Sequence, residues 1–318
     1  MNKQIHLLIS RSLQLIICLV LMDLLLGGAL KHLFFSQKSG KYFRINYTME
    51  MAEASIFIFG SSHALRHYVP EVIEKEISLS CYNAGVLGQQ ILFQSALQTI
   101  VLERTTPVLI ILDIDPNCLF EAQEQYDRLA DFYPYYHKYP KILARVINKR
   151  SGLEKYFLLS KLYQYNSTIV HVIRYWLAPQ KDWNGYRPLF GEIPLSAYAA
   201  QNKQESPLSS KTKKNLLDKN FVEAFEHFIT NAKIKNVRLV FIVSPNVTHS
   251  DISNNASFNK IKSFADRYDI PLFEFLDHPS FIGHYSLFAD FGHLNDTGAK
   301  IFSKLVAKKI RNENLLSK

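Results

Sequence analysis

Polar residues suited to acyl chemistry follow an apolar run near residue 60. The run SIFIFG leads directly into Ser61, Ser62 and His63, where a helical pattern begins. A serine at a helix N-terminus lies beside free backbone N–H groups and the positive end of the helix dipole, both of which stabilise an oxyanion. A helix N-cap also favours serine. The turn therefore predicts either a nucleophile or a cap.

A matching base and carboxylate occur near the C-terminus. Asp290 and His293 lie three residues apart in the segment FADFGHLNDTGAKIF. A histidine can take the proton of a serine, and a carboxylate can fix the tautomer of that histidine. The spacing allows one loop or one helical turn to aim both side chains the same way. Gly85 and Gly88 would let a backbone N–H approach a tetrahedral intermediate without a side chain in between.

Apolar runs that alternate with helical patterns predict the elements that position these residues. The expected strands cover residues 55–60, 79–85, 107–115, 237–245 and 270–277, and the expected helices cover 64–77, 89–102, 216–232, 258–268 and 297–311. Pro70 marks a turn boundary in the first helix. This alternation favours an α/β fold, a flavodoxin-like doubly wound parallel five-stranded sheet. Ligands of such sheets bind beyond the carboxyl ends of the strands, where the candidate residues lie.

An insertion interrupts this pattern. About 120 residues separate the third and fourth strands, which is too long for one crossover helix. We expect an α/β domain over residues 50–318 with an inserted helical or lid region at about 120–212, rich in Tyr, Phe, Trp and Lys. Its aromatic side chains could form the core of the insertion itself or stack on sugar rings.

The N-terminus carries an apolar stretch, Leu13–Leu30, of about the length that spans a bilayer. Asp23 interrupts it and would be costly within a membrane unless it is paired or near an edge. We interpret residues 1–35 as a membrane anchor. A cleaved signal peptide and a buried soluble helix are the alternatives.

Composition excludes some classes of partner. The 318-residue chain has a net charge of +9, but its basic residues are spread out and form no basic helix interleaved with aromatics. We therefore expect no nucleic acid partner and a solvated basic surface, with attraction to anionic lipid or glycan as the alternative. The three cysteines have no metal-ligand spacing, so we expect no metal and no cofactor.

Three motifs together resemble the SGNH, or GDSL-type, hydrolase superfamily. FIFGSSH is similar to its first block, which implies that Ser62 is the nucleophile. YNAGVLGQ is similar to the second block, which implies that the N–H of Gly88 joins that of Ser62 in an oxyanion hole. DFGHLNDTGA is similar to the last block, which implies that His293 is the base and Asp290 its partner. The resemblance covers the core strands and leaves out the insertion.

The third block departs from the pattern of the superfamily. Where an asparagine oxyanion donor is expected, this chain has LDIDPN, with Asp115 near the expected position and Asn117 as a substitute donor. Losing one such donor typically lowers the rate about 10²–10³-fold. His63, His67 and Asp115 are candidate substrate-binding residues, although a packed or solvated role is the alternative for the two histidines.

The resemblance implies a membrane-anchored serine esterase or O-acyltransferase that acts on an acyl ester of an envelope glycan. It also implies a single-pass protein of the cytoplasmic membrane, with its main domain on the extracytoplasmic side. The unusual third block supports an alternative, a catalytically impaired protein that binds glycans or helps to assemble a polysaccharide. A third interpretation is metal-dependent phosphodiester hydrolysis with Asp113 and Asp115 as ligands.

Overall fold

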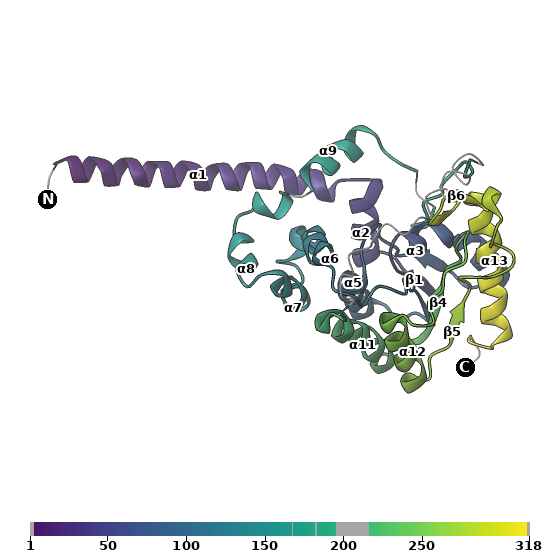
Figure 1. The fold of residues 1–318 in the computed structure, drawn as a ribbon. Helices are drawn as coiled ribbons and strands as arrows, with labels where there is room; N and C mark the ends of the chain where they lie inside the picture. The colour runs from purple at the N-terminus through teal and green to yellow at the C-terminus, as the bar shows by residue number, and fades with distance from the viewer. Residues whose placement is uncertain (1–2, 167, 182, 195–215, 317–318) are drawn as a thin grey trace, which may run out of the picture. The chain divides into compact units, whose positions relative to one another are not determined.

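The chain forms two compact units in the computed structural model, which describes residues 3–166, 168–181, 183–194 and 216–316 (Figure 1). One unit comprises residues 1–43 and 126–181, and we call it the anchor unit. The other comprises residues 44–125 and 182–318, and we call it the α/β unit. The predicted anchor and much of the predicted insertion thus belong to one unit. Residues 195–212 of that insertion lie outside the described residues.

The centre of the α/β unit is a five-stranded parallel sheet. Its strands are β1 (Ile56–Phe59), β2 (Cys81–Asn83), β3 (Leu109–Asp113), β4 (Arg238–Val243) and β5 (Leu272–Glu274). Their order is β2-β1-β3-β4-β5, and every neighbouring pair is parallel. This is the flavodoxin-like order, so the predicted fold class is confirmed. The central strands are buried on both faces, which is why their sequences are continuous apolar runs without alternation.

Helices cover both faces of this sheet. They are α2 (Gly40–Glu50), which begins in the anchor unit, α3 (Ser62–His67), α4 (Pro70–Ile77), α5 (Ile91–Arg104), α11 (Lys219–Ile234), α12 (Ala256–Tyr268) and α13 (Asp296–Asn312). On one face, Ile58 and Ile111 share a core with Phe302 of α13. On the other face, the ring of Phe59 packs 5.7 Å from that of Phe228 of α11. Figure 1 shows α13 and α11 on opposite sides of the strands.

The helix predicted over residues 64–77 is two helices. Tyr68 and Val69 between them are extended, and Pro70 is the first residue of α4. Proline disfavours a helical conformation in the residue before it and has no N–H to donate. The break ends α3 after six residues and turns Tyr68 toward the carboxyl end of β3.

A short hairpin precedes α13. A 3₁₀ turn, η3 (Tyr285–Leu287), leads into β6 (Phe288–Asp290), which pairs antiparallel with β7 (His293–Leu294). Asp290 and His293 are partners across this hairpin, with Phe291 and Gly292 between them. The pair therefore lies on two strands and not on the single loop or helical turn expected from its spacing.

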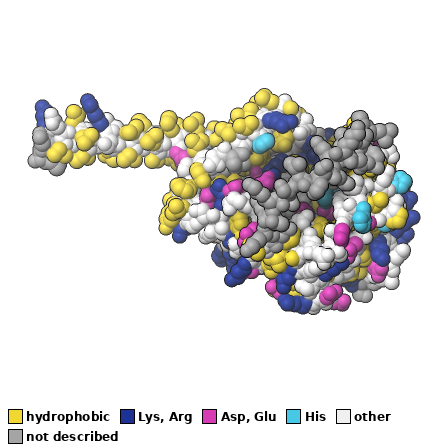
Figure 2. Space-filling model, viewed as in Figure 1, with side chains coloured by type: hydrophobic (Ala, Val, Ile, Leu, Met, Phe, Trp, Pro, Cys, Tyr) yellow, Lys and Arg dark blue, Asp and Glu magenta, His cyan; other side chains and the backbone are white. Residues whose placement is uncertain are grey.

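The anchor unit is helical and has its own aromatic core. It contains α1 (Lys3–Phe35), η1 (Arg128–Tyr135), α7 (Pro140–Arg150), α8 (Glu154–Phe157), η2 (Tyr163–Tyr165) and α9 (Ile169–Leu177), and α6 (Gln123–Asp127) lies at its boundary. The ring of Phe34 lies 5.5 Å from that of Tyr135 and 5.6 Å from that of Tyr165. α1 is long and apolar enough to cross a membrane, and Figure 2 shows hydrophobic side chains along it.

Candidate functional site

The two serines lie at the start of α3, and neither caps that helix. Gly60 follows β1 with a φ of +146°, and a Cβ there would come within 2.8 Å of the Ala64 Cβ, so a glycine is needed at this turn. Ser61 is the buried N-cap residue, and its side chain makes no capping hydrogen bond. The half-buried Ser62 hydroxyl has no hydrogen-bond partner in the described part of the chain. Capping therefore does not explain either serine.

Asp290 and His293 are joined across the hairpin. His293 Nδ1 lies 2.9 Å from Asp290 Oδ1 and 3.1 Å from Oδ2, and the Gly292 N–H donates to the same Oδ1. A hydrogen on Nδ1 donated to this carboxylate leaves the lone pair of the neutral ring on Nε2. His293 Nε2 is buried and has no hydrogen-bond partner among the residues that the structure describes. The ring is thus oriented on one side and unsatisfied on the other.

Helix α3 brings further side chains against His293. The ring of His63 lies 5.5 Å from that of His293, and the ring of His67 lies 6.1 Å from it, both edge-on. Arg66 is close enough to influence His293 electrostatically. Ser62 precedes Arg66 by four residues and so shares its side of the helix. The structure therefore brings the start of α3 to His293, although no hydrogen bond joins Ser62 to His293 Nε2.

Burial sets the charge of the two innermost histidines. It lowers the pKa of His293 below the usual value, against the effect of Asp290, and His63 and Arg66 lower that pKa further. A lowered pKa keeps His293 neutral near pH 7, so Nε2 can accept a proton. Burial also holds the pKa of His67 well below its usual value. His67 Nε2 accepts the Leu294 N–H at 3.1 Å, which ties α3 to β7.

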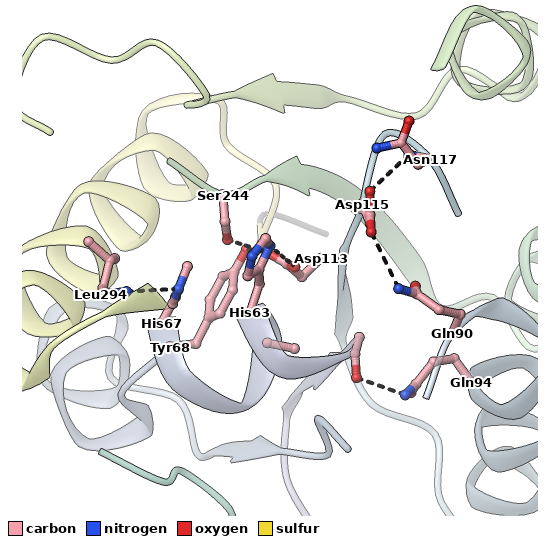
Figure 3. A network of polar contacts seen from close by, with 12 residues as sticks. His63, His67, Tyr68, Gln90, Gln94, Asp113, Asp115, Asn117, Ser244 and Leu294 are labelled. Carbon is pink, nitrogen blue, oxygen red and sulfur yellow. Dashed lines mark hydrogen bonds and ion pairs between the residues drawn. The ribbon is translucent and has the colours of Figure 1, made fainter. Parts of the chain in front are cut away.

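A second polar network lies at the ends of β3 and β4 (Figure 3). Asp113 Oδ2 accepts a hydrogen bond from the Tyr68 hydroxyl at 2.7 Å and another from the Ser244 hydroxyl. His63 Nδ1 lies 3.9 Å from Asp113 Oδ1. Burial raises the pKa of the Asp113 carboxyl. Sequence reasoning did not connect Tyr68 or Ser244 with Asp113, although Ser244 was visible as the end of the fourth strand.

Glycines shape the loop after β2. Gly88 has a φ of +71° in a turn closed by the Gln89 N–H on the Val86 carbonyl, the conformation that favours glycine at the third position. The loop is tied to α3, because Asn83 Nδ2 donates to the Ala64 carbonyl at 2.7 Å. Within the described ranges, the N–H groups of Ser62 and Gly88 donate to no acceptor. Both remain available to an oxyanion.

Asp115 and Asn117 are engaged elsewhere. Asp115 Oδ1 accepts the Asn117 N–H at 2.9 Å, and Oδ2 accepts from Gln90 Nε2 at 3.4 Å. The Asn117 side chain is exposed, and its oxygen accepts from Asn255, the N-cap of α12, at 2.8 Å. Figure 3 places Asp115 and Asn117 apart from His63 and His67. This geometry gives no support to Asn117 as an oxyanion donor or to Asp115 as a contact of substrate near His293.

The third interpretation required a metal site around Asp113 and Asp115. In the described ranges, no group of three His, Cys, Asp or Glu side chains is placed to hold a metal ion. The hydrogen bonds of Asp113 and Asp115 instead join them to neighbouring parts of the fold.

Comparisons with known proteins show likenesses to solved structures and none to a family model or a curated protein. The chain is similar to a solved structure from Desulfitobacterium hafniense DCB-2 assigned to the G-D-S-L family of lipolytic proteins. The two are 10% identical, the similarity covers 80% of this chain and 97% of that chain, and the TM-score is 0.40. At this score the likeness carries no argument about function, which must come from the residues themselves.

Proposed function

We propose that the α/β unit is a serine-dependent esterase or acyltransferase. The hydrogen bonding of His293 carries this proposal. Its Nδ1 contacts Asp290, and its Nε2 is buried without a hydrogen-bond partner among the described residues. A buried polar atom without a partner costs about 1–3 kcal/mol. A buried nitrogen without a partner requires an explanation, and His67 Nδ1 is in the same condition. His293 differs from His67 because a carboxylate holds its other ring nitrogen, as general base catalysis requires.

The proposed reaction assigns one role to each residue. Ser62 Oγ attacks the acyl carbon while its proton passes to His293 Nε2, and Asp290 stabilises the imidazolium that forms. The N–H groups of Ser62 and Gly88 bind the tetrahedral oxyanion. Collapse of this intermediate expels the alcohol, which takes the proton from His293. Water or a sugar hydroxyl then releases the acyl group from Ser62, so the same site supports hydrolysis or transfer.

A cavity in the α/β unit supports a glycan as the substrate. Its volume is about 390 Å³, and it lies at the N-terminal ends of α4 and α13. Trp183, Tyr186 and Phe190 line it together with the carboxylates of Glu71, Glu74 and Asp296. Aromatic faces combined with carboxylates suit a sugar ring, which presents both C–H faces and hydroxyls. Asp296 already accepts from Tyr186 and Lys300, and Glu74 accepts the Cys81 N–H, so a sugar hydroxyl would use their remaining lone pairs or Glu71. Asp296 follows His293 by three residues in the sequence, but Ser62, Asp290 and His293 are not among the residues that line the cavity, which would hold a part of the glycan other than the reacting ester.

The cellular location completes the proposal. We assign the chain to the cytoplasmic membrane as a single-pass protein, with the α/β unit on the extracytoplasmic side, where envelope glycans are exposed. The length and apolar composition of α1 support the membrane span. The side of the membrane follows from the proposed substrate.

Glycan binding without catalysis is the second candidate function. It is favoured by Asp115 and Asn117, whose hydrogen bonds run to other residues, so that Asn117 does not supply the third oxyanion donor expected from the sequence. It would use the same cavity.

The two candidates separate on whether Ser62 is activated. The full-length protein in detergent should be treated with a fluorophosphonate probe, and the labelled peptide identified by mass spectrometry. We expect a single adduct on Ser62 that is lost in Ser62→Ala and His293→Gln. Ser61→Ala is the matched control and should keep the adduct. No labelling of a folded protein that still binds an acetylated oligosaccharide would establish the binding function instead.

A further inference from the structure

The acidic residue within the apolar helix α1 is bound by another part of the anchor unit. Asp23 accepts a hydrogen bond from the Ser160 hydroxyl at 2.5 Å and from the backbone N–H groups of Lys161 at 2.9 Å and Leu162 at 3.0 Å. A carboxylate at membrane depth requires partners of this kind. The bonds also fix the loop 160–162 at the level of Asp23, within the apolar stretch Leu13–Leu30.

Gly27 makes this contact close. It lies four residues after Asp23, on the same side of α1, and a Cβ there would come within 2.5 Å of the Lys161 Cβ and 2.8 Å of the Lys161 carbonyl carbon. A Cβ on the adjacent Gly28 would meet nothing within 4 Å. Asp23 and Gly27 therefore form a seat on α1 for the loop 160–162.

The segments on either side of this loop expose large hydrophobic side chains. They are Leu153, Tyr156, Phe157, Leu159, Leu162, Val170, Ile173, Trp176 and Leu177. Leu159 is 72% exposed and Leu177 is 70% exposed. Exposed apolar groups of this number are unusual on a surface that faces water. Because the loop is seated within the apolar stretch of α1, lipid is the environment that the geometry provides for them.

The charge of the same segment fits an anionic membrane surface. Residues 126–181 contain ten Lys or Arg and three Asp or Glu, a net charge of +7 out of +9 for the whole chain. A cavity of about 540 Å³ next to the seat is lined by Lys31, His137, Lys138 and Lys161, with Phe35 and Leu159 as apolar neighbours. Lys31 and Lys161 form no ion pair within 4 Å among the described residues, and Lys161 interacts at longer range with the Asp23 carboxylate, which its own backbone N–H binds. The cavity thus offers cations beside an apolar wall, which is the arrangement that a lipid phosphate requires.

We propose that the anchor unit is a lipid-binding unit: residues 153–177 enter the membrane interface, and the cavity around Lys31 and Lys161 binds the phosphate headgroup of an anionic lipid. Trp176 and Tyr156 are residue types that favour the headgroup level. This inference concerns the anchor unit alone and does not depend on the chemistry of Ser62.

The cavity is tested with full-length protein in detergent by native mass spectrometry, with phosphatidylglycerol and phosphatidylcholine as the probes. The variant Lys31→Gln/Lys161→Gln should weaken binding of phosphatidylglycerol at least about tenfold. The control Lys141→Gln/Arg145→Gln removes the same charge from exposed positions of α7 and should have little effect. Equal loss in both variants, equal binding of both lipids, or equally tight binding of inorganic phosphate would overturn the proposal. Labelling of Ser62 should be unchanged in both variants.

The insertion of residues 153–177 is tested by fluorescence in liposomes. In a Trp183→Phe background, Trp176 is the remaining tryptophan, because the chain contains two. Brominated lipid should quench its emission, and aqueous iodide should not. Gly27→Ala should reverse this pattern by unseating the loop, whereas Gly28→Ala, the matched helix substitution, should preserve it. Strong quenching by iodide in the unsubstituted Gly27 protein would show that the segment faces water.

Discussion

Two histidine–carboxyl pairs meet at α3, and their environments differ sharply. His293 and Asp290 are in direct contact at 2.9 Å, and the Asp290 side chain is 57% exposed. His63 and Asp113 are 3.9 Å apart, and the Asp113 side chain is 1% exposed. Two hydroxyls donate to Asp113, whereas a backbone N–H and an imidazole donate to Asp290.

The difference shows how environment assigns a role to the same residue types. The Asp290 side chain faces solvent and contacts His293 Nδ1, so this carboxylate can orient an imidazole and stabilise its cation. Asp113 is cut off from water, and burial raises the pKa of its carboxyl, so the charged form that could stabilise an imidazolium is disfavoured there. The difference lies in the carboxyls, and it supports the proposed catalytic role for His293 and Asp290 and a structural role for Asp113.

The largest expected effect separates the two histidines. His293→Gln should lower kcat/KM for p-nitrophenyl acetate by about 10²–10⁴-fold, because the proton of Ser62 loses its acceptor. His63→Gln should change it by less than about tenfold, since His63 transfers no proton in the proposed reaction. Circular dichroism should show that both variants are folded. The opposite order would make His63 the base and reverse the assignment of the pairs.

Substitutions of the two carboxyl residues should show the same contrast, with smaller losses of activity. Asp290→Asn should lower kcat/KM about 10–10²-fold, because the amide favours the wrong tautomer of His293 while solvent partly screens the lost charge. Its free energy of unfolding should stay within about 0.5 kcal/mol of wild type. Asp113→Asn should retain activity within about threefold. Comparable losses of activity in both variants would contradict the contrast.

The pH profile of wild type sharpens the role of Asp290. The base must be neutral, so activity is lost as pH falls through the pKa of His293, which burial lowers below its usual value of about 6.5. The midpoint of the acid limb of kcat/KM should therefore lie below about pH 6.5. Asp290 raises the pKa of His293, so Asp290→Asn should move the midpoint to still lower pH. An upward shift would show that the two groups are not coupled as described.

The sheet was predictable from the sequence because buried parallel strands leave a local signature. SIFIFG and PVLIILDID are continuous apolar runs, and β1 and β3 lie within them. The hairpin was not predictable, because β7 has two residues and leaves no periodicity. The break after α3 was only suggested by Pro70.

Contacts among the candidate residues were predictable where the residues are close in sequence. Asp290 and His293 are three residues apart, and their contact follows from that spacing and a turn. Ser244 and Asp113 are 131 residues apart, and Ser160 and Asp23 are 137 apart, so their contacts depend on packing. The basic residues of 126–181 are dispersed along the sequence. Their relation to a membrane surface becomes apparent only from the contact of the loop 160–162 with α1.

The smallest effect concerns the buried carboxyl. The pKa of Asp113 is raised in the folded state, so the stability it contributes is present below the unfolded value of about 4 and is lost as pH rises through the folded pKa. Asparagine does not titrate and can still accept from Tyr68 and Ser244. As pH rises from about 4 through the folded-state pKa, wild type should therefore lose stability relative to Asp113→Asn, by about 1.4 kcal/mol for each unit by which the pKa is raised. Urea denaturation in detergent measures this, with the exposed Asp290→Asn as control. The same pH dependence in wild type and Asp113→Asn would mean that Asp113 is not a buried acid, and the two pairs would lose their distinction.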